Sequence, residues 1–219
     1  MKKTSRALDS ETQAAPAERR KRVRLSPEVR SRQLLDSALI EFSQHGYLGA
    51  RIEDIGRRIG LSKSGVYAHY RSKEEIFEAL LNRVLRPLEA DLFSIPDDGE
   101  SLEAIIDRFI DMAYERLADP SMMSMLRLMI AESVRVPGLI QRWYGEVVLP
   151  YHQAQERILQ KAVASGALQR SALTENFALV YAPAVYASLM AGVHQGQSDG
   201  LPGFREAHRQ MVHALLKAP

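Results

Sequence analysis

The chain has 219 residues, of which 46% are hydrophobic and 26% charged, and these proportions are typical of a soluble globular protein with one or two domains. It contains no Cys, which excludes disulfide frameworks, thiolate metal sites and cysteine nucleophiles. No apolar run reaches the roughly 18 residues that a membrane-spanning helix needs, and the polar N-terminus lacks the apolar core of a signal peptide. We therefore expect a cytoplasmic protein that does not bind membranes.

The net charge of +2 is distributed unevenly along the chain. Residues 1–73 carry 16 Lys and Arg against 8 Asp and Glu, whereas residues 74–219 carry 13 against 19. This asymmetry suggests an N-terminal part that meets a polyanion and a remainder with another task. Residues 1–25 have few large apolar side chains and a basic run from Arg19 to Arg24, which predicts a disordered basic arm. Such an arm can neutralise DNA phosphates, and a merely solvated tail explains it equally well.

The first predicted helix spans residues 26–46. Ser26 is suited to cap it, and Pro27 occupies the first helical position, where its missing N–H costs nothing. Gly46 is expected to end the helix. Its inward stripe falls at helical spacing and consists of Leu35, Ala38, Leu39 and Phe42.

Residues 52–73 contain two short helical patterns joined by a tight turn. The first pattern has an apolar face made of Ile52, Ile55 and Ile59. Gly60 follows where a helix ends in a left-handed residue, and Ser62 can cap the second helix. In that second helix Val66 and Tyr70 lie four residues apart on one face. The pattern predicts a helix-turn-helix, which residues 26–46 support from a third side.

The rest of the chain also has helical periodicity. Ser72 and Glu75 form a capping box for a helix that Pro87 should end near Arg86. Residues 95–99 (Ile-Pro-Asp-Asp-Gly) are a loop and the predicted domain boundary. Further helices are expected over residues 102–117, from 120 onward, over 139–164 with an interruption at Pro150, over 174–193 with Thr174 as cap, and from 203 to about 216. No segment alternates convincingly with period two, so the predicted fold class is all-α.

Residues 33–81 resemble the DNA-binding part of the TetR family of bacterial transcriptional regulators. The resemblance is strongest in GLSKSGVYAHYRSKEEIF, residues 60–77, which is similar to that family's recognition helix running into its fourth helix. It implies an N-terminal helix-turn-helix domain over residues 26–73 and a ligand-binding and dimerisation domain over 74–219, in which 74–95 form a linking helix. It also implies a homodimer on a pseudo-palindromic double-stranded DNA operator, with residues 62–70 of each subunit in a major groove.

The resemblance further implies the DNA-contacting residues. Lys63 and Ser64 would reach bases or phosphates, and Tyr67, His69 and Lys73 match positions that commonly hold phosphates. Lys and Tyr are suitable donors to phosphate oxygens, although a surface aromatic and a solvated imidazole are the ordinary explanation for such residues outside a motif. The full set of expected DNA-binding residues is Arg51, Ser62, Lys63, Ser64, Tyr67, His69, Tyr70 and Lys73.

Two positions depart from the family's pattern. Arg51 stands where the family usually has a Thr or Ser that caps the second helix, and an Arg side chain cannot accept the orphan N–H. Glu53 and Asp54 offset part of this loss at the helix N-terminus, and Arg51 is a candidate phosphate contact instead. Gly65 replaces a frequent Thr, which removes a hydroxyl and lowers helix propensity by about 1 kcal/mol relative to Ala.

The C-terminal helices are expected to enclose a small-molecule effector of largely apolar type. Flexible Met side chains and aromatic residues suit such a ligand, although at any single position a Met that fills the core is the simpler explanation. The candidate ligand-binding residues are Tyr114, Met122, Met125, Met129, Trp143, Tyr144 and Tyr151. Two C-terminal helices resemble a subunit interface, with candidate residues Ala184, Ser188, Ala191, Phe204, Met211 and Leu215, although a monomeric core could supply part of their cover.

Catalytic function is not expected. The six His residues show no zinc-helix spacing, and no Gly-x-Ser-x-Gly elbow or phosphate loop occurs, so we expect no metal and no cofactor. The sequence therefore predicts a ligand-responsive DNA-binding regulator, specifically a repressor that a small molecule releases from its operator. The alternatives are a helical protein-interaction module and a nonspecific architectural DNA-binding protein.

Overall fold

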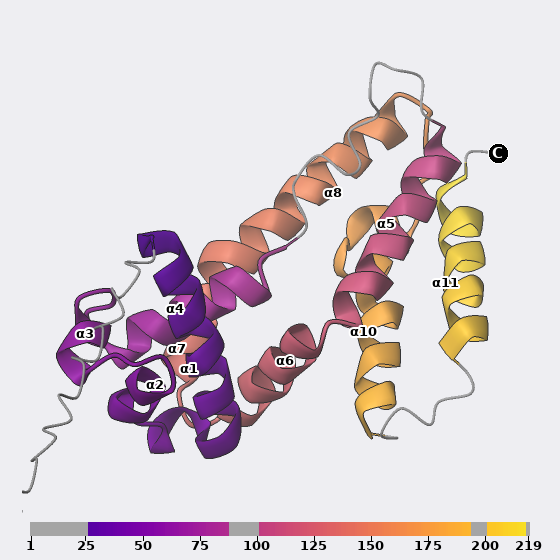
Figure 1. Ribbon diagram of the computed structural model, residues 1–219. Helices are drawn as coiled ribbons and strands as arrows, with labels where there is room; N and C mark the ends of the chain where they lie inside the picture. The colour runs from indigo at the N-terminus through magenta and orange to yellow at the C-terminus, as the bar shows by residue number, and fades with distance from the viewer. Residues whose placement is uncertain (1–25, 88–100, 194–200, 218–219) are drawn as a thin grey trace, which may run out of the picture.

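The computed structural model describes residues 26–87, 101–193 and 201–217 of the chain, and their regular elements are all helical (Figure 1). This confirms the predicted all-α class. The predicted basic arm (1–25), the loop at residues 95–99 and the end of the predicted linking helix lie outside the described residues. In chain order the elements are α1 (Pro27–Gly49), α2 (Ile52–Arg58), α3 (Lys63–Tyr67), α4 (Lys73–Val84), α5 (Leu102–Leu117), α6 (Pro120–Glu132), α7 (Pro137–Trp143), the π-helix η1 (Tyr144–Val148), α8 (Leu149–Ala164), α9 (Ala172–Glu175), α10 (Ala178–Val193) and α11 (Leu201–Leu216).

Helix α1 begins as its sequence predicts and is interrupted near its end. The Ser26 hydroxyl accepts from the Val29 backbone N–H at 3.3 Å, and Pro27 opens the helix. Gly46 has a φ of +70°, a left-handed conformation that glycine adopts without penalty. The regular helix breaks there, as expected, but one further turn follows to Gly49.

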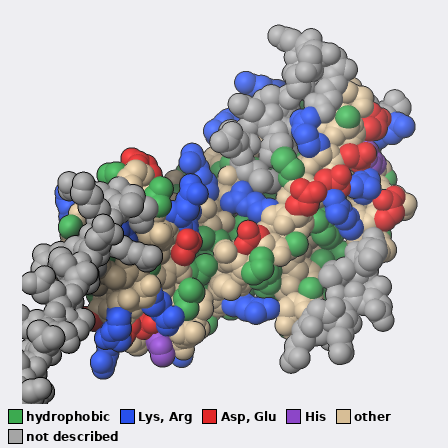
Figure 2. All heavy atoms as spheres, in the orientation of Figure 1, with side chains coloured by type: hydrophobic (Ala, Val, Ile, Leu, Met, Phe, Trp, Pro, Cys, Tyr) green, Lys and Arg blue, Asp and Glu red, His purple; other side chains and the backbone are tan. Residues whose placement is uncertain are grey.

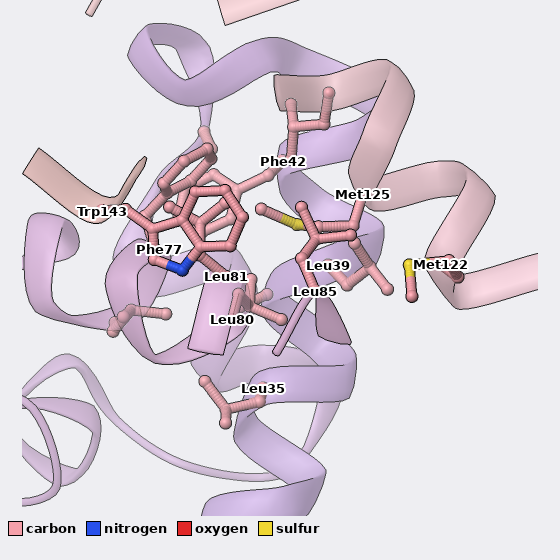
Figure 3. Packing of buried hydrophobic residues seen from close by; sticks show 14 of the residues in the cluster. Leu35, Leu39, Phe42, Phe77, Leu80, Leu81, Leu85, Met122, Met125 and Trp143 are labelled. Carbon is pink, nitrogen blue, oxygen red and sulfur yellow. The ribbon is translucent and has the colours of Figure 1, made fainter. Parts of the chain in front are cut away.

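The first core joins the N-terminal helices to the middle of the chain. Phe42 of α1 and Phe77 of α4 are fully buried and pack edge to face at 5.3 Å between ring centroids (Figure 3). Met125 of α6 and Trp143 of α7 lie against the same cluster. The helix-turn-helix region is therefore not a separate body, because C-terminal helices complete its core.

A second core lies at the other end of the molecule. Helices α5, α8, α10 and α11 pack around Phe109 and Phe177, whose ring centroids are 5.9 Å apart. In Figure 1, α6 lies between this group and the N-terminal helices, and α8 runs diagonally across the molecule. Within the described ranges, no helix is both long and apolar enough to cross a bilayer.

Three predicted boundaries differ from the structure. The interruption expected at Pro150 takes the form of η1 immediately before α8, because Pro150 has no N–H to continue the α-helical hydrogen bonds. Thr174 does not cap the long helix: it lies in the short helix α9, where its hydroxyl accepts from the Ser171 N–H at 3.0 Å, and α10 begins only at Ala178. Helix α11 begins at Leu201 rather than after Gly203.

Candidate DNA-binding surface and ligand cavity

The turn between α2 and α3 is built as the sequence predicts. Gly60 has a φ of +69°, and the Leu61 N–H donates to the Gly56 carbonyl at 2.9 Å. The Ser62 hydroxyl accepts from the Gly65 N–H at 3.1 Å and so caps α3. Val66 is fully buried and anchors α3 against α2. These contacts fix the orientation of a helix only five residues long.

The outer surface of α3 and of the turn that follows it presents polar side chains to solvent. Lys63, Ser64, Tyr67 and His69 are all exposed, and Tyr67 retains 40% of its accessible surface. The Lys63 ammonium lies 2.6 Å from a Glu53 carboxylate oxygen, and this contact raises the pKa of Lys63 and lowers that of Glu53. A DNA phosphate that binds the Lys63 ammonium must therefore share it with the Glu53 carboxylate or displace that carboxylate.

Two predicted DNA-binding residues make contacts inside the protein. The Tyr70 hydroxyl is 2.8 Å from the Ser31 hydroxyl of α1. The Lys73 ammonium donates to the carbonyls of Leu48 and Ala50 at 3.1 Å each and lies 5.0 Å above the Tyr47 ring, and burial lowers its pKa. Both side chains therefore connect the α1 region to the segment that follows α3. Because an ammonium has three N–H groups and two of them are bonded to carbonyls, Lys73 has one N–H left for a phosphate.

Arg51 stands at the N-cap of α2, and its side chain makes no capping hydrogen bond there. Replacing Arg51 by Ser should raise the free energy of unfolding by about 1 kcal/mol, because a Ser hydroxyl can accept an orphan N–H at this position. Chemical denaturation of both proteins measures the difference. Ser62→Ala is the matched control and should lower the stability by a similar amount, since it removes the observed cap of α3. A destabilised Arg51→Ser protein would contradict this explanation.

A cavity of about 630 Å³ lies among the helices of the C-terminal part and the segment that directly follows α4. Such a volume suits a drug-sized molecule. Its wall is largely apolar and is formed by Leu85, Arg86, Pro87, Phe109, Ala113, Arg116, Leu117, Met122, Leu126, Met129, Ile140, Gln141, Trp143, Tyr144, Val148, Tyr151, His152, Tyr181 and Val185. Five of the seven candidate ligand-binding residues line it, namely Met122, Met129, Trp143, Tyr144 and Tyr151.

The other two candidates, Met125 and Tyr114, lie outside the cavity lining. Met125 is fully buried in the first core, where it packs near Phe42 (Figure 3). Tyr114 faces α11 instead, with the Arg205 guanidinium 5.5 Å from its ring centroid and the His208 ring centroid at 5.9 Å. Neither position could be told from a cavity position by periodicity, because both lie on inward faces of their helices.

The polar residues of the cavity were largely missed by the sequence interpretation. The His152 Nε2 atom and the Tyr181 hydroxyl are 2.6 Å apart. Burial lowers the pKa of His152 and raises that of Tyr181 to about 12, so both groups are neutral at pH 7. Burial also raises the pKa of Tyr151. No spacing in the sequence distinguished His152 or Tyr181 from other residues of their helices.

Comparison with known proteins agrees with this geometry. The model for "Bacterial regulatory proteins, tetR family" matches residues 34–80, and the model for "Tetracyclin repressor-like, C-terminal domain" matches residues 95–199. The HTH-type transcriptional regulator TtgW of Pseudomonas putida is 30% identical over 143 residues, which cover 64% of this chain and 96% of that protein. The chain belongs to the TetR family.

Other members of the TetR family are also similar. The HTH-type transcriptional repressor SCO4008 of Streptomyces coelicolor is 31% identical over 139 residues. That match covers 63% of this chain and 64% of the repressor, slightly less than two thirds of its length. The crystal structure of a TetR family transcriptional regulator from Pseudomonas syringae pv. tomato shares the fold with a TM-score of 0.67 at 20% identity, covering 89% of this chain and all of that one.

The candidate subunit interface of this TetR-family protein divides into covered and exposed residues. Ala184 is fully buried within its own chain, so its side chain is not available to a second subunit. Ser188 and Ala191 are half-buried, and the Ser188 hydroxyl donates to the Ala184 carbonyl at 2.9 Å. The remaining three candidates lie on α11: Phe204 is half-buried and packs on Tyr186, whereas Met211 and Leu215 are exposed.

Charged side chains form a network beside these exposed residues. Asp111 of α5 contacts Arg205 and Arg209 of α11 at 2.5 Å each, and Asp107 lies 2.8 Å from the His213 ring. Figure 2 shows acidic and basic side chains intermixed over this end of the molecule. These ion pairs connect α11 to α5 within one chain, and the carboxylates of α5 neutralise the basic side chains of α11.

Proposed function

We propose that this TetR-family regulator is a transcriptional repressor that acts in the cytoplasm as a homodimer on a pseudo-palindromic operator and is released by a largely apolar small molecule. The family is regulatory rather than catalytic. The Streptomyces relative is named a transcriptional repressor, which supports the proposed sign of regulation. The exposed face of α3 is available for DNA, and the exposed Met211 and Leu215 suit a subunit contact.

One observation supports ligand response above the others: the cavity wall includes the residues that directly follow α4. Leu85, Arg86 and Pro87, which directly follow α4, line the cavity, while Lys73 at the start of α4 is bonded to the carbonyls of Leu48 and Ala50 at the end of α1. A molecule in the cavity therefore contacts the segment that directly follows α4, a helix that is attached to the DNA-binding helices. If it shifts α4, it changes the separation of the two α3 helices from the roughly 34–36 Å that successive major grooves require.

Selection of bound sites from a random duplex pool, followed by footprinting, tests the DNA-binding part. A repressor of this kind protects a short symmetric site. Protection without sequence preference would instead indicate an architectural protein, and the absence of protection would favour a protein-interaction module. Mapping of bound sites on the chromosome then identifies the neighbouring genes.

Lys63→Gln and Tyr67→Phe test the assigned DNA surface. Each should weaken binding to all sequences, and Lys63→Gln should also reduce the slope of log affinity against log salt by about one, because the protein then neutralises one phosphate fewer. Arg170→Gln, a change at an exposed Arg far along the chain, is the control and should alter neither quantity. Arg51→Ala is informative in the same assay, because an unchanged affinity and salt slope would count against a phosphate contact at Arg51.

A further inference from the structure

Arg116 of α5 connects the cavity to the end of α4. Its guanidinium donates to the Val84 carbonyl at 3.2 Å and also to the Arg86 carbonyl. The last carbonyls of a helix have no partner within it, so Arg116 supplies part of the C-terminal cap of α4. The same side chain lines the cavity. Burial lowers the pKa of Arg116, yet a guanidinium remains protonated at neutral pH.

The Tyr151 hydroxyl is a second hydrogen-bond donor near Arg116. The Tyr151 hydroxyl and Arg116 interact electrostatically, and the positive charge of Arg116 opposes the rise of the Tyr151 pKa. Burial nevertheless keeps the Tyr151 pKa above its ordinary value, so Tyr151 keeps its proton at neutral pH. The cavity thus offers a cation and, at Tyr151, a neutral donor.

The charge of the cavity wall has one sign. Of the described residues that line it, two are Arg and none is Asp or Glu. A ligand ammonium would be buried near Arg116 without a carboxylate to compensate it, which is costly. A ligand carboxylate or phenolate would instead receive charge-assisted hydrogen bonds. The wall favours an acid on electrostatic grounds.

We propose that the effector is an apolar acid, and that its acidic group binds Arg116 in competition with the α4 carbonyls. This inference rests on the proposed function and names the ligand class of the same cavity. The hydrophobic part of the ligand packs against side chains such as Met122, Met129 and Leu126. When the guanidinium turns to the acid, the end of α4 loses its cap, and the DNA-bound position of α4 is weakened. Arg116 is in this way both a specificity residue and the link to α4.

Three probes of one shape test the ligand class: 4-cyclohexylbenzoate, 4-cyclohexylbenzamide and 4-cyclohexylbenzylamine. Each is titrated into the full-length protein by calorimetry, and the fluorescence of Trp143, the only Trp, reports occupation of the cavity. We expect the benzoate to bind at least tenfold more tightly than the amide, and the amine most weakly. The proposal is overturned if the benzoate binds no more tightly than the amide or the amine. It is also overturned if none of the three probes binds.

Variants test the role of Arg116. In Arg116→Gln the benzoate should lose its advantage over the amide, and saturating benzoate should no longer reduce DNA affinity. In Tyr151→Phe the benzoate should bind several-fold more weakly, with the amide much less affected. Arg157→Gln, at an exposed Arg of α8, is the matched control and should preserve the benzoate preference and DNA release. A benzoate preference retained in Arg116→Gln refutes the assignment.

The outcomes separate this proposal from the proposed function. Probe preference is measured without DNA, so a protein that selects no DNA site but prefers the benzoate contradicts the repressor proposal alone. Specific DNA binding without a preference for the benzoate contradicts the ligand class alone. If Arg116→Gln does not fold, as its circular dichroism would show, the wild-type preference and Tyr151→Phe still decide the matter.

Discussion

Replacing Gly56 by Ala should lower the free energy of unfolding by about 3 kcal/mol and greatly weaken specific DNA binding. A Cβ atom at this position would lie 2.6 Å from the Leu61 carbonyl oxygen and 3.0 Å from a Val66 methyl carbon. The carbonyl belongs to the backbone of the turn, so relief of the clash requires α2 and α3 to separate. Overpacking of this kind typically costs about 1–3 kcal/mol, and the backbone contact places Gly56 at the upper end.

Chemical denaturation and operator binding of the Gly56→Ala protein measure the two effects. Gly138→Ala is the matched control, because a Cβ built at this helical position has no described atom within 4 Å apart from its chain neighbours and the backbone of its own helix. That change should be neutral or stabilise the protein by up to about 1 kcal/mol through helix propensity. Equal free energies of unfolding for the two variants would contradict the expected clash between a Cβ at Gly56 and the Leu61 carbonyl.

Phe77→Ala should destabilise the protein still more, by about 3–5 kcal/mol. Phe77 is fully buried, and its ring centroid lies 5.3 Å from that of Phe42 (Figure 3). The Tyr47 ring centroid lies 5.1 Å from that of Phe77. Truncation removes both aromatic contacts and leaves a cavity beside residues from α1, α6 and α7. Because these elements share one core, loss of Phe77 should weaken the N-terminal and C-terminal helices together.

Thermal unfolding monitored by circular dichroism and by Trp143 fluorescence tests this expectation. Both signals should shift to lower temperature by the same amount, since Trp143 lies in the same cluster as Phe77. Leu48→Ala is the control, because Leu48 is 65% exposed and its truncation should change the stability by less than about 0.5 kcal/mol. Two separate transitions would argue against a shared core.

Features that depend on local backbone chemistry could be predicted from the sequence. Ser62 caps α3, Gly60 adopts the left-handed conformation, and α5 spans the predicted residues, Leu102–Leu117. Each of these depends on hydrogen bonds or conformational preferences within about four residues along the chain. The resemblance to the TetR family predicts which face of the helix-turn-helix contacts DNA. Helical periodicity alone does not predict this face.

Features that depend on distant partners could not be predicted. Lys73 bonds to carbonyls 23 and 25 residues away, and Arg116 to carbonyls 30 and 32 residues away. Helical periodicity says that Met125 and Ala184 face inward, but it does not distinguish a core from a cavity or a subunit interface. Those distinctions require the packing of helices that are far apart in sequence.

The shared core has a consequence for chimeric regulators. The predicted division between residues 73 and 74 separates Phe42 from Phe77, although their rings are packed together. A recombinant chain that takes residues 1–73 from this protein and the remainder from a relative would bring two differently shaped halves of one core together. Successful exchange of DNA specificity therefore requires transplanting the exposed side chains of α3 alone, with the buried cluster left intact.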